Sequence, residues 1–273
     1  MLRIIEELNR ADAIVVGAGA GLSTSAGLTY DGKRFEDHFS EFIQKYGMTD
    51  MYSAGFYPFE TKEEKWAYWS KHIFYNRYND GSTEVYQNLH ELVQGKNYFV
   101  LTTNVDHQFH LSGFESEKIF ATQGDYGLFQ CARGCHKKLY DNETEVRKMV
   151  AEQNDCKIPK YRIPKCPVCG GDMEVNLRID GYFVEDENWN KAAKKYSSFL
   201  AENQNKRILF LELGVGSNTP GIIKYPFWKM TNQWKNSFYI CMNKGQALAP
   251  DEISSRSICI DGDIGQILRC ITK

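Results

Sequence analysis

The sequence has 273 residues, of which 42% are hydrophobic and 14% aromatic, and its formal net charge is −2. This length exceeds that of most single compact domains and falls short of two independent ones, so we expect one domain with a sizeable insertion. The near-neutral charge excludes electrostatic attraction to nucleic acid or to an anionic membrane as the basis of function. Acidic residues near the N-terminus (Glu6, Glu7 and Asp12) and an apolar run far shorter than the roughly 20 residues of a membrane span predict a cytoplasmic protein. Its eight cysteines should then be reduced thiols or metal ligands.

The hydrophobic pattern predicts an alternation of helices and strands. Residues 2–11 carry apolar side chains at helical spacing, and residues 13–21 follow as a buried strand that ends in a glycine turn. Further helical patterns lie at residues 83–95 and 264–271, and five more short apolar runs end in small or polar residues: residues 97–104, 116–124, 206–217, 236–245 and 255–263. Such strands are typical of a parallel sheet covered on both faces, with a binding site at its carboxyl ends.

Two segments interrupt this alternation and predict a second, smaller domain. Residues 28–80 are aromatic-rich, and within them residues 62–78 predict a helix with Trp66, Trp69 and Ile73 on one stripe. This stripe is most simply a buried core face. As an alternative, basic residues on its rim could contact an acidic carrier protein: Lys62, Lys65, Lys71 and Arg77.

The second interrupting segment, residues 124–185, holds five of the eight cysteines. Cys131 and Cys135 form one close pair, and Cys166 and Cys169 form another after a loop. Two such pairs predict a zinc ribbon, in which four thiolates close a tetrahedron and leave no position for water, so the Zn²⁺ should be structural. Cys156 and His136 lie nearby as substitute ligands, but two complete pairs make that substitution unnecessary.

The glycine turn Gly17-Ala-Gly19-Ala-Gly21-Leu-Ser23 follows a strand but lacks the complete dinucleotide-binding fingerprint. Small residues there would let backbone N–H groups approach a pyrophosphate, with Ser23 as a further donor. Glycines in a turn from strand to helix also serve tight packing alone. Later strand ends, "GVGSNTPG" and "CMNKG", add glycines and an asparagine, and together these features predict nucleotide binding.

The ordered set of motifs resembles the sirtuins, a family of NAD-consuming enzymes. "ADAIVVGAGAGLSTSAGL" resembles the family's opening glycine motif, and "TTNVDHQFHLSG" resembles T-Q-N-I-D-x-L-H-x-x-A-G. The cysteine pairs have the family's spacing, and "GVGSN", "CMN" and "IDGD" resemble its three closing motifs. The resemblance implies an α/β fold: a Rossmann-like parallel-sheet large domain, with a small domain made of a helical module and a zinc ribbon.

The resemblance also implies domain boundaries and a set of NAD contacts. The NAD-binding domain would comprise residues 1–27, 98–124 and 186–273, the helical module residues 28–97, and the zinc-ribbon module residues 125–185. Asn104 would hold the nicotinamide ribose or its attacking face, Asp106 would hold the carboxamide, and Gln123 would complete the catalytic group. The full set of implied NAD contacts is Gly19, Ala20, Gly21, Ser23, Arg34, Asn104, Asp106, Gln123, Gly214, Gly216, Ser217, Asn218, Asn243, Asp263 and Ile264.

One departure from the family bears directly on function. Gln123 stands where sirtuins carry the histidine that acts as general base. An amide cannot accept a proton at neutral pH, and loss of a general base typically costs about 10²–10⁴-fold in rate, so deacylation should be slow or absent. We expect no rescue from His107 or His110, because the helix after the strand would turn both partly away.

A carboxylate acceptor needs no such base, because it is already ionised and can trap the ribose cation directly. The glutamine, together with "GLTYDGKRF" in place of G-I-P-D-F-R, resembles the macrodomain-linked sirtuins of bacterial pathogens and fungi. That resemblance implies an NAD-dependent protein mono-ADP-ribosyltransferase that modifies a lipoylated, glycine-cleavage-H-like carrier protein, with a macrodomain hydrolase as the reversing partner. The alternatives are an NAD-dependent lysine deacylase with an unconventional base, an NAD-binding sensor without catalysis, and an NAD hydrolase.

Overall fold

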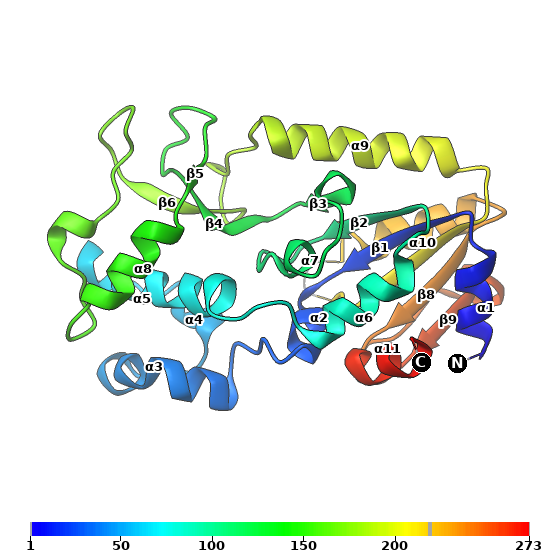
Figure 1. The fold of residues 1–273 in the computed structure, drawn as a ribbon, viewed down its shortest axis with the longest axis horizontal. Coiled ribbons are helices and arrows are strands. Elements are labelled where there is room, and N and C mark those ends of the chain that lie inside the picture. The colour runs from blue at the N-terminus through cyan, green and yellow to red at the C-terminus, as the bar shows by residue number, and fades with distance from the viewer. Residues whose placement is uncertain (1, 218–219, 273) are drawn as a thin grey trace.

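The computed structural model describes residues 2–217 and 220–272. A large sheet domain lies at the right of Figure 1, and a smaller domain built of helices and a short sheet lies at the left. No helix within these described ranges is both long enough and apolar enough to cross a membrane.

The large domain is built on a parallel sheet of six strands in the order β3-β2-β1-β7-β8-β9. All six strands predicted from the apolar runs are present: β1 (Ala13–Ala18), β2 (Tyr98–Thr102), β3 (Ile119–Ala121), β7 (Ile208–Leu213), β8 (Phe238–Met242) and β9 (Ser257–Ile260). The central strands β1, β2 and β7 are buried along their whole length, which explains their continuous apolar sequence.

Helices cover both faces of this sheet, and each face has its own hydrophobic cluster (Figure 1). One face is covered by α1 (Leu2–Arg10), α2 (Ala20–Ser25), α6 (Glu84–Val93) and α11 (Ile264–Ile271). The other is covered by α9 (Glu187–Asn203) and α10 (Lys224–Gln233). Short helices lie in the connections: α7 (Gln108–Leu111), η2 (Ser116–Lys118) and η4 (Asp251–Arg256).

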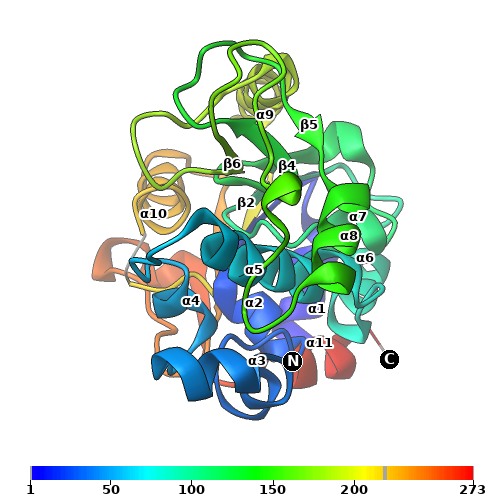
Figure 2. The same cartoon turned by 90° about the vertical axis from the view of Figure 1, so that its left-hand side faces the viewer.

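The smaller domain combines the two interrupting segments (Figure 2). Its helices are α3 (Gly32–Tyr46), α4 (Met51–Ala54), α5 (Lys62–Ile73), the π-helix η1 (Phe74–Tyr78), α8 (Glu143–Glu152) and the turn η3 (Lys160–Arg162). Its antiparallel sheet has the order β5-β4-β6, formed by β4 (Gly124–Cys131), β5 (Tyr140–Asp141) and β6 (Met173–Leu177). One hydrophobic cluster contains side chains from both segments, including Trp66 and Ile73 of the predicted stripe.

Local sequence explains where α5 begins. Thr61 accepts a hydrogen bond from the Glu64 N–H, and Glu64 accepts one from the Thr61 N–H, which forms a capping box. The position of α6 differs from the sequence-based grouping, which placed residues 84–97 in the helical module. Val85, Tyr86 and Leu89 pack into the core of the large sheet, because the apolar face of α6 contacts α11.

Candidate functional site

A cleft of about 360 Å³ lies between the carboxyl edge of the large sheet and the smaller domain. The large domain contributes the start of α2 and residues 103–106, which follow β2. The smaller domain contributes residues 28–31, residues 50–52 and Asn76. The predicted site residues Ala20, Ser23, Asn104 and Asp106 all line this cleft.

The orientation of the Asn104 side chain is fixed by its neighbours. Its amide nitrogen donates to the Gly19 carbonyl at 3.0 Å, and it lies 3.1 Å from the hydroxyls of Ser23 and Tyr86. Because a carbonyl can only accept, the nitrogen must face Gly19, and the amide oxygen must face away from it. Asn104 therefore presents a hydrogen-bond acceptor that carries partial negative charge.

Ser23 and Asp106 extend the hydrogen-bond network of the Asn104 amide. Ser23 donates its hydroxyl to Asp106 Oδ2 at 2.5 Å, and the Gln108 N–H donates to Asp106 Oδ1 at 3.1 Å. Burial raises the pKa of Asp106, and these two hydrogen bonds oppose the rise. Since the single Ser23 proton is directed at Asp106, Tyr86 must donate to the Ser23 oxygen, 2.8 Å away. The polar residues below the cleft thus form one connected and buried network.

Gln123 takes its position from the register of two adjacent strands. Thr102 at the end of β2 pairs with Ala121 at the end of β3. Asn104 and Gln123 each lie two residues beyond those paired positions, at the same edge of the sheet, but Gln123 is in the turn before β4 and is not among the residues that line the cleft. Gln123 is half-buried, and its carbonyl accepts from the Arg178 N–H at 3.0 Å.

The two histidines near Asn104 are held away from the cleft, as predicted. His107 Nδ1 lies 2.8 Å from Asp125 Oδ2, and the His110 ring stacks on His107 at 4.0 Å. Both line a separate cavity of about 20 Å³ behind Asn104. Burial and the neighbouring His107 lower the pKa of His110 to about 4, so its ring is neutral at pH 7.

The glycines of the first turn serve backbone packing. The Gly19 and Gly21 N–H groups donate to the carbonyls of Leu213 and Gly214 at 3.0 and 2.9 Å. A Cβ atom at Gly19 would lie 2.7 Å from the Gly214 oxygen, and one at Gly21 would lie 2.7 Å from the Gly214 Cα. Gly214 itself has a φ of 62°. Tight packing, the alternative to nucleotide binding in the sequence analysis, thus requires glycine at these three positions, and their contact with NAD stays a prediction.

The residues predicted for the other end of NAD follow β7, β8 and β9. The Ser217 N–H and hydroxyl both lie 3.0 Å from Gln246 Oε1, next to Gly216. Asn243 donates its side-chain amide to the Val215 carbonyl at 2.9 Å, so it holds the strand ends together. Asn218 lies outside the described residues.

Asp263 and Ile264 begin the last helix. Asp263 caps α11 by accepting from the Gln266 N–H at 2.8 Å, and it also accepts from Ser25 at 3.2 Å. The Ile264 side chain is buried in the core. Any contact of Ile264 with a ligand would therefore involve its backbone.

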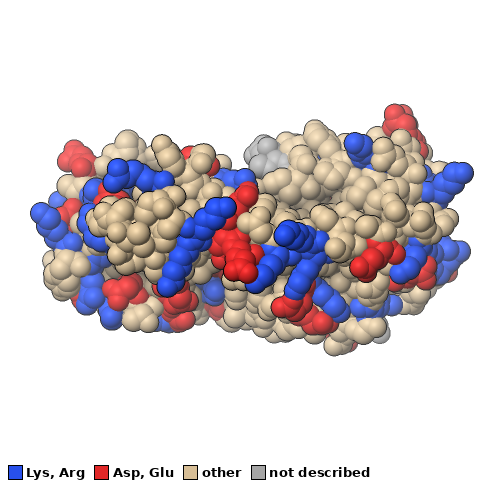
Figure 3. All heavy atoms as spheres, turned by 90° about the horizontal axis from the view of Figure 1, so that it is seen from above, with Lys and Arg blue, Asp and Glu red and all other residues tan. Residues whose placement is uncertain are grey.

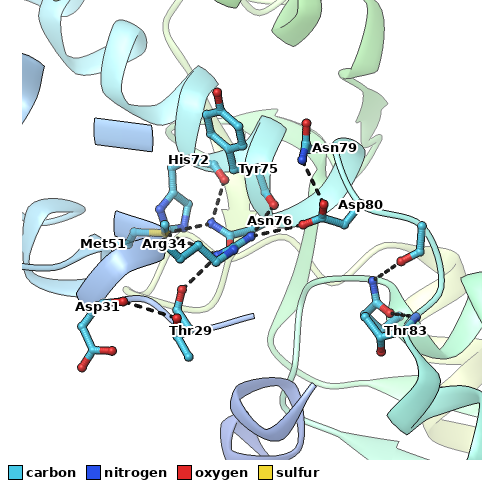
Figure 4. A network of polar contacts seen from close by, with 12 residues as sticks. Thr29, Asp31, Arg34, Met51, His72, Tyr75, Asn76, Asn79, Asp80 and Thr83 are labelled. Atoms are coloured by element: carbon cyan, nitrogen blue, oxygen red, sulfur yellow. Dashed lines mark hydrogen bonds and ion pairs between the residues drawn. The ribbon is translucent and has the colours of Figure 1, made fainter. Parts of the chain in front are cut away.

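Arg34 does not line the cleft, and its guanidinium is bound within the smaller domain (Figure 4). It donates to the Thr29 carbonyl at 3.0 Å, to Asn76 Oδ1 at 2.9 Å and to the Tyr75 carbonyl at 2.6 Å. It also lies 3.6 Å from Asp80. Arg34 thus joins residues 28–31 to the π-helix, and its predicted role as a ligand of NAD has no support in this arrangement.

The four predicted metal ligands meet at one point. The sulfur atoms of Cys131, Cys135, Cys166 and Cys169 all lie within 4.8 Å of one another. Two sulfur pairs, Cys131–Cys169 and Cys135–Cys166, are each 3.7 Å apart. Zn–S bonds of about 2.3 Å at tetrahedral angles require sulfur separations of roughly 3.8 Å, so the cluster fits a zinc ion. Cys156 lies apart from this cluster, in a groove beside α3 and α8.

Comparisons with known proteins give the family. No protein-family model matches the sequence. A protein ADP-ribosyltransferase of Staphylococcus aureus strain Mu50 is 39% identical over 262 residues, which cover 96% of this chain and 83% of that protein. Solved structures of similar fold include a Sir2 homologue in complex with NAD, with a TM-score of 0.68, 16% identity and coverage of 100% of this chain and 92% of that one.

The chain belongs to the protein ADP-ribosyltransferase family, and its fold is that of the Sir2 structures. A Sir2 enzyme bound to a propionylated peptide also matches in fold, with a TM-score of 0.65, 19% identity and coverage of 99% of this chain and 96% of that one. A probable bifunctional ADP-ribose hydrolase/ADP-ribosyltransferase of Fusarium oxysporum f. sp. cubense is 32% identical over 284 residues. That match covers 96% of this chain and 46% of the fungal protein.

The four basic residues on the rim of the helical module are each paired with an acidic side chain. Lys62 pairs with Asp172 at 2.7 Å and Arg77 with Asp125 at 2.9 Å, and Lys65 and Lys71 pair with Glu174 and Glu41. These side chains connect the helical module to neighbouring elements. Figure 3 shows basic and acidic residues interspersed on the face that carries α9.

The lining residues that the sequence analysis did not place in the site include Tyr30, Asp50 and Asn76. All three come from the smaller domain, and Tyr30 lies in residues 27–35, where the sirtuin motif is not kept. Asn76 lies in the π-helix, and only 4% of its surface is exposed. In the sequence, the only signal for Asn76 was an asparagine within the otherwise largely aromatic segment Phe74–Tyr78.

Proposed function

We propose that this sirtuin is an NAD-dependent protein mono-ADP-ribosyltransferase. The observation that carries the proposal is Gln123, which follows β3 at the sheet edge that also carries Asn104, at the position where the sirtuin resemblance places the base of a deacylase. The family relationship to a protein named protein ADP-ribosyltransferase supports the same reaction.

The cleft residues suit cleavage of NAD and transfer to a carboxylate. The bond from the ribose C1′ to the nicotinamide nitrogen would break, and the nitrogen would keep the electron pair. An acceptor carboxylate would then supply the pair for a new bond to C1′, so no proton need be removed. Asn104 would direct its amide oxygen at the positive charge that develops on the ribose, and Asp106 would hold the carboxamide. Gln123 would orient ribose hydroxyls.

The cysteine cluster would hold one Zn²⁺ as a structural ion. Four thiolates complete its coordination, so the ion would fix the fold of the smaller domain and supply no water or substrate position.

As acceptor we propose a lipoylated, glycine-cleavage-H-like carrier protein, in the cytoplasm, with a macrodomain hydrolase that reverses the modification. The carrier rests on the resemblance of the Gln123 substitution and of residues 27–35 to the macrodomain-linked class. A reversing hydrolase is supported by the fungal relative, whose name joins an ADP-ribose hydrolase to an ADP-ribosyltransferase.

The test uses purified protein, NAD labelled in its adenylate part, and the carrier with and without lipoylation. We expect label on the carrier, nicotinamide in equal amount, and no deacylation of an acyl-lysine peptide. Asn104→Ala serves as the inactive control. Efficient peptide deacylation would favour the deacylase alternative, whereas tight NAD binding without nicotinamide release would favour a sensor.

A further inference from the structure

Five hydrogen bonds form a closed ring behind the wall of the cleft. Tyr30 and Tyr126 join their hydroxyls at 2.7 Å, Tyr126 lies 2.9 Å from His72 Nε2, and His72 Nδ1 lies 3.2 Å from the Tyr68 hydroxyl. Tyr68 then donates to the Met51 carbonyl at 2.5 Å, and the Met51 N–H donates to the Tyr30 carbonyl at 2.7 Å. We call these five residues the Tyr30 ring.

Each proton in this ring has only one position. The Met51 carbonyl can only accept, so Tyr68 uses its proton there and must itself accept from His72 Nδ1–H. Burial, assisted by Arg34, lowers the pKa of His72 to about 3, so the imidazole is neutral and its Nε2 is an acceptor. Tyr126 therefore donates to His72, and Tyr30 donates to Tyr126.

The consequence reaches the cleft through Tyr30. Its proton points inward, and burial raises its pKa to about 12, so it offers no base to the cleft at neutral pH. The ring also fixes two smaller-domain segments of the wall, because Tyr30 lines the cleft and Met51 lies between the lining residues Asp50 and Tyr52. Arg34 adds a further bond to this wall through the Thr29 carbonyl.

We propose that Tyr30 is a positioning residue that keeps the cleft wall closed against water, so that the acceptor protein rather than water captures the ribose. This inference rests on the proposed function. It concerns how the ribose is partitioned between capture by the acceptor protein and capture by water. With water, the same C1′–nitrogen bond breaks, a water oxygen forms the new bond, and one proton passes to solvent. Among the described residues, the cleft lining contains no histidine to act as a base for water, and a rigid wall that excludes bulk solvent would further favour transfer.

The experiment measures the ratio of free ADP-ribose to ADP-ribosylated carrier, together with kcat and KM for NAD. Tyr126→Phe removes one hydroxyl from the ring, and Tyr126 does not line the cleft. Tyr30→Phe removes the same hydrogen bond from the cleft side and replaces Tyr126→Phe if that variant does not fold. Either variant removes a buried hydrogen bond and leaves its partner unpaired. We expect the ratio of free ADP-ribose to ADP-ribosylated carrier to rise about tenfold in each. We also expect kcat for transfer to fall by a larger factor than KM for NAD changes.

The matched control is Tyr78→Phe. Tyr78 belongs to the same domain and donates to Asn142 at 2.6 Å, outside the ring. We expect its ratio to equal that of the wild type. An unchanged ratio in Tyr126→Phe and Tyr30→Phe, or an equal rise in Tyr78→Phe, would overturn the inference while the proposed function stands. A wild-type protein that labels no carrier would overturn the proposed function and the inference with it.

Discussion

The two domains are held together by different means. The large sheet buries aliphatic side chains such as Ile14, Val16 and Leu211 between regular layers of helices. The smaller domain buries a cluster of rings, among them Phe39, Tyr68 and Trp66. It adds ion pairs that join its segments, and four cysteines placed to hold a metal.

The difference follows from how each core is assembled. Parallel strands present a continuous surface that small branched side chains fill layer by layer. The smaller domain joins two segments that are distant in sequence, and its short sheet belongs to only one of them. Large side chains therefore hold the two segments together, and a metal would fix the second. In the cleft between the two domains, strand register therefore positions the wall of the large domain, and side-chain contacts position the wall of the smaller domain.

Zinc removal should produce the largest difference in stability between the two domains. Structural zinc contributes on the order of 10–16 kcal/mol in zinc-finger peptides, so chelation should unfold the smaller domain and abolish transfer. We expect a loss of near-ultraviolet dichroism from the aromatic cluster, while the parallel sheet keeps a separate thermal transition. Cys166→Ser should behave like the chelated protein, and Cys156→Ser should retain one zinc per chain. A single unchanged transition after complete zinc loss would contradict the expectation.

Asn104→Ala tests the wall that the strands supply. Loss of one preorganised electrostatic contact to a developing charge typically costs about 10²–10³-fold in kcat. We expect that loss in nicotinamide release together with a smaller drop in the thermal midpoint, because the truncation also removes the hydrogen bond to the Gly19 carbonyl. Asn104→Asp would serve as a second variant of similar size. Activity within a fewfold of wild type would exclude the assigned role.

A pair of core truncations sharpens the contrast. Trp66→Ala should cost about 3–5 kcal/mol in unfolding free energy and Leu211→Ala about 2–5 kcal/mol. Trp66 packs against Phe129 at 5.1 Å, within the cluster that also contains Cys131 and Cys166. Only Trp66→Ala should therefore accelerate zinc release to a chelator, measured by a colorimetric indicator. Equal acceleration by both variants would show that the two cores are not independent.

Lys62→Met should have the smallest effect. The Lys62–Asp172 pair is partly exposed, and such pairs are worth about 0–1 kcal/mol. Urea denaturation should place the variant close to wild type. Transfer to the carrier should also be unchanged, because Lys62 is paired within the molecule and does not line the cleft.

The sequence predicted the large domain well because its signals are local. Six apolar runs became the six strands, and the shared carboxyl edge brought Asn104 and Asp106 into one cleft. The cysteine spacing likewise fixed the metal cluster, since a tetrahedral site tolerates few arrangements.

Contacts between distant segments could not be predicted. Arg34 has the charge expected of a phosphate ligand, yet its partners Asn76 and Tyr75 lie more than a helix away along the sequence. Lys62 and Lys65 appeared free because their acidic partners, Asp172 and Glu174, belong to the other segment. The apolar face of α6 carries no sign of which domain it covers, and only the packing against α11 decides that.

The close approach of Gly19 and Gly21 to Gly214 means that the turn after β1 and the turn after β7 cannot move independently. Backbone touches backbone there, and neither side has a side chain that could move aside. New nucleotide preferences would therefore have to arise at the outer parts of the cleft, in residues 28–31 or 50–52, where side chains form the surface. The glycine contacts between the two turns would stay the same while the side chains of residues 28–31 and 50–52 change.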